Sequence, residues 1–482
     1  MTSRHVTSAP ARQPRRAAPM ALAALLTLAA CAVTTPPAPD APHSPAAWLM
    51  ADAGPNARLD APWWQPLGDA TLSALIDDAL ARNRDVARAA VRLQQAEAQA
   101  RRSAQDRWPT VTGGARAGVQ RPLQRSGPDA VVINGVSVPL PDASGTSTNS
   151  GTSLSATWEP DLWGRVAASV AAAEQAVRIS EVDRETARWL ITTQVAEQYW
   201  RIAMADRKLP LAAAASTDAA ASLKATALQF EVGKLKALDV ARAEAALAEA
   251  RQREAQLATQ RRAALFALAL LLDRPVAAME VPEARLPASE PDAFNAGPPA
   301  AVLDRRPDLR SARLALDAAL LKARVTEASR YPPVQLSASL GAGGASLGQW
   351  LANPLAGLGL ALSLPMLDAA RQRADQDLAA LQVKDAAIAF RDGVAKALSD
   401  VEAQFNQRRQ LDQDRAVALD KQRTARAALE VARRRHAAGA DALQKVREAE
   451  QALRDADAAL VELQLSRWLN LVAIHKALGG PV

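Results

Sequence analysis

Few side chains in this 482-residue sequence have the types and spacing that catalysis requires. There is one cysteine, Cys31, so the chain forms no internal disulfide and holds no cysteine cluster for a metal. The four histidines, His5, His43, His436 and His475, lie far apart in the sequence, which disfavours a metal centre or a histidine-dependent triad. The sequence also lacks a glycine-rich phosphate loop and a nucleophile elbow. We therefore expect no enzymatic activity, no metal and no cofactor.

The chemistry that the sequence does favour is acylation of Cys31. A basic segment with Arg12, Arg15 and Arg16 precedes an apolar stretch, Ala17 to Ala30, that is too short to span a membrane as a stable helix. Small residues directly before the cysteine are typical of a bacterial lipobox, in which the thiol receives diacylglycerol and residues 1–30 are removed. The alternative is an ordinary secretory signal with an incidental cysteine.

Composition favours a helical protein with thin interfaces. Apolar residues make up 49% of the chain, but aromatic residues make up only 4%, and much of the apolar share is alanine. The 23% of charged residues excludes disorder throughout and a polytopic helical membrane protein. Residues 1–30 hold four arginines and no acid, so the formal charge of +7 falls to +3 without them. A charge so near balance argues against a nucleic-acid partner.

The chain is an internal twofold repeat. Residues 83–111 align with residues 306–334 at an offset of 223, and residues 233–257 align with residues 439–463 at an offset of 206. The first copy therefore holds 17 more residues between the matched blocks. The predicted segments are a signal peptide (1–30), a tether and equatorial segment (31–71), the first copy (72–272), a proline-rich linker (273–308), the second copy (309–478) and a C-terminal tail (479–482).

Each copy contains two segments in which apolar residues alternate with polar residues or glycine, the pattern of strands with one apolar face. These four strands begin near Val111, Leu154, Val334 and Leu358, and each is about as long as a membrane-barrel strand. The alternative is a half-buried strand of a soluble sandwich. The loop at about Arg121–Gly151 is longer than its counterpart, which suits a loop that faces outside.

The remainder of each copy is predicted to be helical. A helix at about Leu72–Arg107, and its counterpart Leu309–Ser329, precede the strands. Gly233 and Gly439 interrupt the later helices at equivalent points, where we expect a left-handed cap and a reversal of the chain. The helices that follow the strands are predicted over Arg165–Ala205, Leu211–Leu272, Arg371–Ala438 and Ala440–Leu478, with a coiled-coil seam at Val446, Ala449, Leu453, Ala456, Leu460 and Leu463.

Four strands with apolar outer faces cannot close a barrel, and open sheet edges are not tolerated in lipid. Several chains must therefore supply strands to one β-barrel, and the same symmetry gathers their helices into a helical tube. The fold predicted for one chain is thus mainly α with a small β part. The assembly is a hollow conduit from the membrane into the periplasm.

Three motifs resemble the TolC-like outer-membrane efflux factors, in their lipoprotein (NodT/OprM) branch. They are Trp64-Gln65-Pro66-Leu67-Gly68-Asp69, Trp158-Glu159-Pro160-Asp161-Leu162-Trp163-Gly164-Arg165 and Arg305-Arg306-Pro307-Asp308-Leu309. The resemblance covers nearly all of the chain after the signal. It implies a homotrimer with a twelve-stranded transmembrane barrel and an α-barrel of twelve helices, anchored in the outer membrane through Cys31. It also implies a periplasmic membrane-fusion adaptor and an inner-membrane pump, commonly of the RND class.

The resemblance also assigns roles to the hairpin tips, which meet the adaptor and form the gate in this family. Phe230, Val232 and Gly233 match the first tip, and Ala438 and Gly439 match the second. The second tip lacks the usual aromatic residue before its glycine. The residues that match the family's gate are Asp441, Lys445 and Glu448, and Lys445 stands where TolC itself has an aspartate.

The function predicted from these features is a passive exit duct for small molecules, driven by a partner pump. An outer-membrane duct of a type I polypeptide secretion system would use the same fold. A periplasmic coiled-coil adaptor is a third possibility, but an adaptor would have a single hairpin and a lipoyl or β-rich domain.

The lipobox can be tested by replacing Cys31 with serine. Because diacylglycerol attaches through the thiol, Cys31→Ser should abolish incorporation of radiolabelled palmitate and weaken retention of the protein in the membrane fraction. Unchanged labelling would refute the lipobox.

Overall fold

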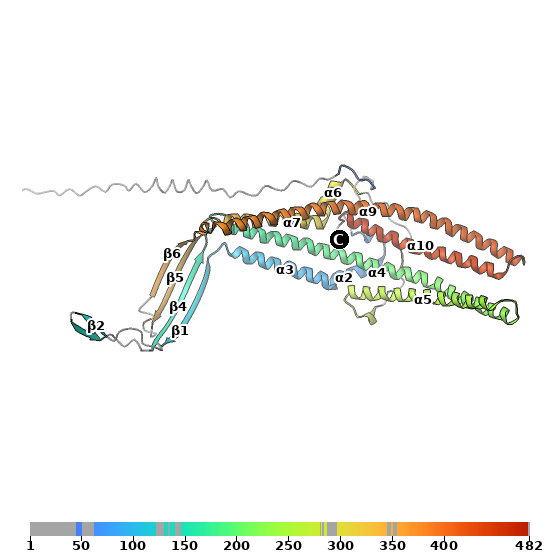
Figure 1. The fold of residues 1–482 in the computed structure, drawn as a ribbon, viewed down its shortest axis with the longest axis horizontal. Helices are drawn as coiled ribbons and strands as arrows, with labels where there is room; N and C mark the ends of the chain where they lie inside the picture. The colour runs from blue at the N-terminus through green and yellow to red at the C-terminus, as the bar shows by residue number, and fades with distance from the viewer. Residues whose placement is uncertain are drawn as a thin grey trace, which may run out of the picture. The chain divides into compact units, whose positions relative to one another are not determined.

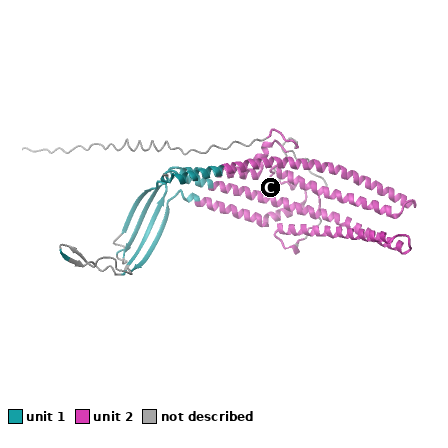
Figure 2. Ribbon diagram, viewed as in Figure 1, with its two compact units in different colours: residues 1–38, 103–172, 319–383 teal, residues 39–102, 173–318, 384–482 magenta. Residues whose placement is uncertain are grey.

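The computed structural model describes residues 45–50, 62–121, 130–133, 135–139, 146–279, 281, 284–286, 296–344, 349 and 354–480. The predicted signal peptide and Cys31 lie outside these residues. The chain forms two compact units, and each takes segments from both copies of the repeat (Figure 2). The first unit includes residues 103–172 and 319–383, and the second includes residues 39–102, 173–318 and 384–482.

The first unit contains a four-stranded antiparallel sheet (Figure 1). Its strands, in spatial order, are β1 (Thr110–Gln120), β4 (Ser147–Trp158), β5 (Val334–Gly344) and β6 (Pro354–Leu362). The prediction of four antiparallel strands, two from each copy, is confirmed. Within the described part of the chain, β1 and β6 each pair with one neighbour only, so the sheet has two open edges.

The register of this sheet brings the apolar residues of all four strands to one face. Residues directly opposite each other on paired strands point to the same side of a sheet. Val111 pairs with Ala156, and Ala156 in turn pairs with Ala338, which pairs with Leu358. The adjacent row consists of Thr112, Ser155, Ser339 and Gly357, which lie on the opposite face. The predicted period-two alternation therefore continues across the whole sheet.

A second, two-stranded sheet lies in the long loop after β1 and was not predicted. Its strands are β2 (Ala130–Ile133) and β3 (Val136–Pro139). The sequence between them is Asn134-Gly135, the dipeptide that most favours a two-residue hairpin turn, and Gly135 has a φ of 80°. The predicted loop boundary at Gly151 is also wrong, because β4 begins at Ser147 and pairs with β1 from there.

Two helical hairpins follow the strands, and the first helix of the first hairpin is longer than predicted. They consist of α4 (Arg165–Glu231) with α5 (Ala237–Leu271), and α9 (Ala369–Ala437) with α10 (Leu443–Ala477). The predicted break between Ala205 and Leu211 is wrong, since α4 runs through Pro210. Just before the proline, Ile202 and Ala203 are fully buried, Asp206 pairs with Arg261 of α5, and Lys208 pairs with Glu462 of α10 at 3.1 Å. Among the described residues, no helix has both the length and the apolar character that a membrane crossing would need.

The predicted helix at Leu72–Arg107 is in fact two helices, α2 (Ala70–Arg82) and α3 (Arg84–Gln105). Asn83 separates them with non-helical backbone angles. Its Oδ1 accepts hydrogen bonds from the backbone N–H groups of Asp85 and Val86, at 2.8 and 3.3 Å, which caps α3. Its Nδ2 donates to the carbonyl of Leu271 at 2.9 Å, so the break also ties α3 to the end of α5. In the second copy, the corresponding helices are α6 (Pro299–Arg305) and α7 (Pro307–Ala328).

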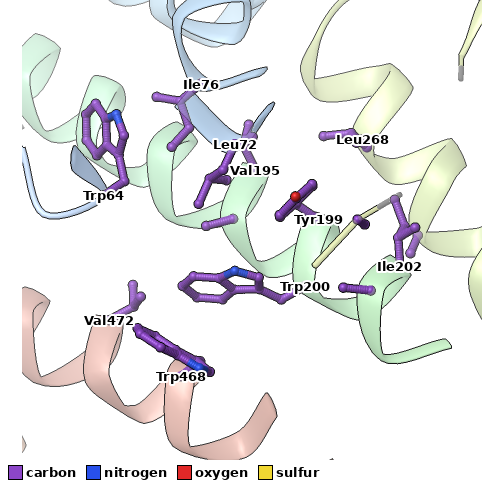
Figure 3. Packing of buried hydrophobic residues seen from close by; sticks show 14 of the residues in the cluster. Trp64, Leu72, Ile76, Val195, Tyr199, Trp200, Ile202, Leu268, Trp468 and Val472 are labelled. Carbon is purple, nitrogen blue, oxygen red and sulfur yellow. The ribbon is translucent and has the colours of Figure 1, made fainter. Parts of the chain in front are cut away.

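The core of the second unit is a cluster of tryptophan and aliphatic side chains that joins segments far apart in sequence (Figure 3). Trp200 of α4 and Trp468 of α10 are fully buried, with ring centroids 5.5 Å apart. Tyr199 donates to Asp69 Oδ2 at 2.8 Å and accepts from the N–H of Arg285 at 3.2 Å. The segment before α2 and the described part of the linker therefore pack against the helices.

His475 of α10 is buried in this core region beside Trp63. Its burial should make the free energy of unfolding depend on pH. Burial lowers the pKa of His475 to about 4, so the folded state resists protonation of a ring that the unfolded chain protonates below about pH 6.5. This contribution to stability is complete above pH 6.5 and is lost as the pH falls towards 4, amounting to roughly 2.5 kcal/mol at pH 4.5.

The corresponding experiment compares the wild type with His475→Phe, which keeps an aromatic ring but does not titrate. The apparent melting temperature, followed by circular dichroism in detergent, should fall more for the wild type than for the variant between pH 7 and pH 4.5. Equal falls would show that His475 does not cause the loss.

Candidate functional site

The two hairpins end in turns of the same construction. Gly233 and Gly439 have φ values of 74° and 71°, the left-handed conformation that favours glycine. After α4, Gly233 N–H donates to the carbonyl of Phe230 at 2.9 Å and Lys234 N–H donates to that of Gln229 at 2.8 Å. After α9, the same pair of bonds runs from Gly439 to His436 and from Ala440 to Arg435, at 2.9 and 2.8 Å. Both are Schellman caps, so the predicted helix ends at the two glycines are confirmed.

The helices that leave the two turns begin differently. Asp239, in the first turn of α5, accepts a hydrogen bond from the backbone N–H of Lys236 at 3.0 Å. The equivalent residue in α10 is Lys445, which has no acceptor to offer, and α10 has no side-chain cap. Lys445 instead binds Glu448 at 2.9 Å. The repeat therefore keeps the backbone of the turn but not the charge at this position.

The first tip exposes more large apolar side chains at its turn than the second, where Leu443 is the exposed one. Phe230 is 45% exposed and Val232 is 67% exposed, and Leu228 and Leu238 nearby are also exposed. The second tip places His436, Ala437 and Ala438 at the corresponding positions. Exposed apolar side chains of this size, gathered at one turn, are typical of a surface that contacts another protein.

The three predicted gate residues are each held by a neighbour of the same tip. Arg435 Nε donates to Asp441 Oδ2 at 2.7 Å, and His436 Nδ1 lies 2.9 Å from the carbonyl oxygen of Asp441. The hydrogen bond from Lys445 lowers the pKa of Glu448, and the same bond raises the pKa of Lys445. The charges of Asp441, Lys445 and Glu448 are therefore each paired within the chain and do not form an acidic cluster.

The motif from Trp158 to Arg165 connects the sheet to α4, and each of its polar residues has a partner. Asp161 accepts from the N–H groups of Val166 and Ala167 at 3.1 and 2.7 Å and so caps α4. Glu159 and Arg165 form an ion pair at 2.8 Å. Trp163 stacks on Tyr331 with ring centroids 4.8 Å apart, and its Nε1 donates to the carbonyl of Pro332. The motif thus joins the two copies where their strands begin and end.

The motif at the start of α7 is held by Arg306, whose guanidinium is almost fully buried. It donates to Asp308 at 2.7 Å and to Asp400 of α9 at 3.2 Å. It also donates to the carbonyls of Ala397 and Ala477, each at 3.3 Å. Burial alone would lower the pKa of Arg306, but its hydrogen bonds to the two carboxylates outweigh burial and raise it.

The sequence did not reveal which charged residues pair at the tips. Arg435 and Asp441 are six residues apart, on opposite sides of the turn, and their spacing alone does not identify them as a pair. That pairing could have been inferred once the left-handed glycine between them was accepted. Among the described residues, no three side chains of metal-binding types come together.

Comparison with known proteins identifies the family of this chain. The model of the outer membrane efflux protein family matches residues 75–274 and 299–480, which is most of the chain. The pyoverdine export outer membrane protein OpmQ of Pseudomonas putida is 31% identical over 461 residues, covering 94% of this chain and 95% of that protein. OpmQ of Pseudomonas aeruginosa is 29% identical, covering 95% of this chain and 96% of that protein.

Solved structures of outer-membrane channels have the same fold as this chain. The outer-membrane channel OprN superposes with a TM-score of 0.78 at 25% identity, over 93% of this chain and 99% of that chain. The open state of the Neisseria gonorrhoeae outer membrane channel MtrE superposes with a TM-score of 0.77 at 26% identity, over 93% and 98% of the two chains. The predicted resemblance is confirmed: this chain belongs to the outer membrane efflux protein family, the TolC-like channels of the bacterial outer membrane.

Proposed function

We propose that three copies of this chain form the outer-membrane channel of a tripartite efflux system. The channel is a passive conduit for small molecules that a periplasmic adaptor and an inner-membrane pump, of the RND class, deliver to it. The protein itself performs no chemistry. The export function named for its relatives supports this proposal over a polypeptide secretion duct.

The observation that carries the proposal is the one-sided sheet. Leu358 and Leu360 of β6 are 92% and 71% exposed in the single chain, on the same face as Val111 of β1 and Leu340 of β5. An apolar face of this extent is costly in water and favourable in lipid. The open edges of β1 and β6 would expose unpaired backbone groups there, so β6 of one copy pairs with β1 of the next. Three copies then close a twelve-stranded barrel.

The long hairpins supply the periplasmic part. The seam of α10 and its counterpart in α5 are only half-buried in one chain, although Val446 and Leu247 are buried. Seams of this kind are completed by neighbouring helices. Twelve helices from three chains form the wall of the tube, with lipid on Cys31 as an additional anchor.

The tips are the adaptor contact and the gate. Phe230, Val232 and Gly233 present an apolar surface that fits apolar side chains of an adaptor hairpin, and Ala438 and Gly439 form the smaller second contact. The ion pairs of Arg435 with Asp441 and of Lys445 with Glu448 hold the second tip in its resting conformation.

Removing the charge of Asp441 tests the gate. Asp441→Asn weakens the bond to Arg435, and because an exposed ion pair contributes about 0.2–1 kcal/mol, the open probability should rise by up to about fivefold. Single-channel recordings in planar lipid bilayers measure this directly. The matched control is Asp455→Asn, which also removes one negative charge. Asp455 lies within α10, about 20 Å along the hairpin from Asp441.

Equal open probabilities for Asp441→Asn and the wild type would leave Asp441 as a surface residue of the turn. An increase of the same size in Asp455→Asn would indicate an effect of net charge and not of the gate.

A further inference from the structure

The polar face of the sheet is almost free of charge. Among the residues of β1, β4, β5 and β6, Arg116 is the only one with an ionisable side chain. The other polar residues of these strands are serine, threonine, asparagine and glutamine, interspersed with glycine. A single charge on such a surface dominates its electrostatic potential.

The register places Arg116 on the polar face. Arg116 pairs with Gly151 of β4, which pairs with Gly343 of β5. Thr112, four residues earlier in β1 and on the same face as Arg116, contacts Ser155 through their hydroxyl oxygens at 2.8 Å. Arg116 therefore points away from the face that carries Val111, Leu154 and Leu358.

The side chain of Arg116 lies over Gly151, its partner on β4, which has no side chain of its own in the way. A Cβ atom at Gly151 would lie 3.8 Å from Nε of Arg116, 3.1 Å from the carbonyl oxygen of Ala342 and 3.5 Å from Cα of Gly343. Gly151 is buried, whereas Arg116 is exposed. The arginine side chain thus covers the glycine and offers its guanidinium to solvent.

Among the residues that the structure describes, no acid pairs with this arginine. Neither an ion pair nor a hydrogen bond of the Arg116 side chain occurs within the described part of the chain. This distinguishes it from Arg435 and Lys445 at the second tip, which are both paired. A free guanidinium binds carboxylate and phosphate oxygens in bidentate geometry and attracts anions generally.

We infer that Arg116 makes the strand-built wall of the channel selective for anions. The inference rests on the proposed function, because that function places the polar face on the lumen. Three chains contribute three arginines at one level, about 20 Å along β1 from Thr110. Like charges that line a narrow passage raise the local concentration of counter-ions. Solutes with a carboxylate or phosphate group are the class that this ring favours.

The test is the reversal potential of the purified full-length protein in planar bilayers under a tenfold gradient of potassium chloride. Arg116→Gln should lower the ratio of chloride to potassium permeability by about twofold or more. Arg116→Lys, which keeps the charge, should retain the ratio of the wild type. The difference between wild type and Arg116→Gln should shrink in 1 M salt, where the Debye length is about 3 Å.

The outcomes separate the two proposals. Channels of wild type and Arg116→Gln with the same reversal potential would overturn the role of Arg116 and leave the conduit intact. A lowered ratio in Arg116→Lys as well would overturn it too, since the charge would not be the cause. Absence of any current from either protein would contradict the proposed function and this inference with it.

Discussion

The constraint on which the rest of the structure depends is that one face of a four-stranded sheet is apolar and its two edges are open. Pairing from Val111 across Ala156 and Ala338 to Leu358 aligns the apolar residues of both copies in one register. A shift of one residue between any two strands would mix the faces. One apolar face and one polar face are what the proposed position between lipid and water requires, and in the proposed barrel the two open edges pair with strands of neighbouring copies.

Because the chain is an internal duplication, the same turns and, apart from β2 and β3, the same order of strands and helices occur in both copies. The same Schellman cap ends α4 and α9, and an aspartate before each of these helices accepts hydrogen bonds from its first turn, Asp161 for α4 and Asp368 for α9. The copies then diverge in their side chains. Asp239 caps α5 whereas Lys445 cannot cap α10, and Phe230 is exposed at one tip whereas the other presents alanine and histidine. A shared backbone with different surfaces allows the two tips to contact different parts of a partner.

Most of the fold could be predicted from the sequence because its signals are local and repeated. Alternation identified the four strands, and Gly233 and Gly439 identified the turns. The errors arose where a local signal competed with tertiary contacts. Pro210 does not break α4, which is packed just before it through the fully buried Ile202 and Ala203 and is paired with α5 and α10. Asn83 does break a continuous helical pattern, because its side chain caps α3 and binds Leu271. The pairing of Arg435 with Asp441 needed the geometry of the turn, which spacing alone does not give.

The central claim is that one chain builds an incomplete sheet that only further copies can close. Native mass spectrometry of the mature protein, released from detergent micelles, measures the number of chains in the particle directly. The account predicts a complex of three chains that persists on dilution. A stable single chain that retains its sheet would contradict this prediction, because the edges of β1 and β6 would then need no strand from another copy.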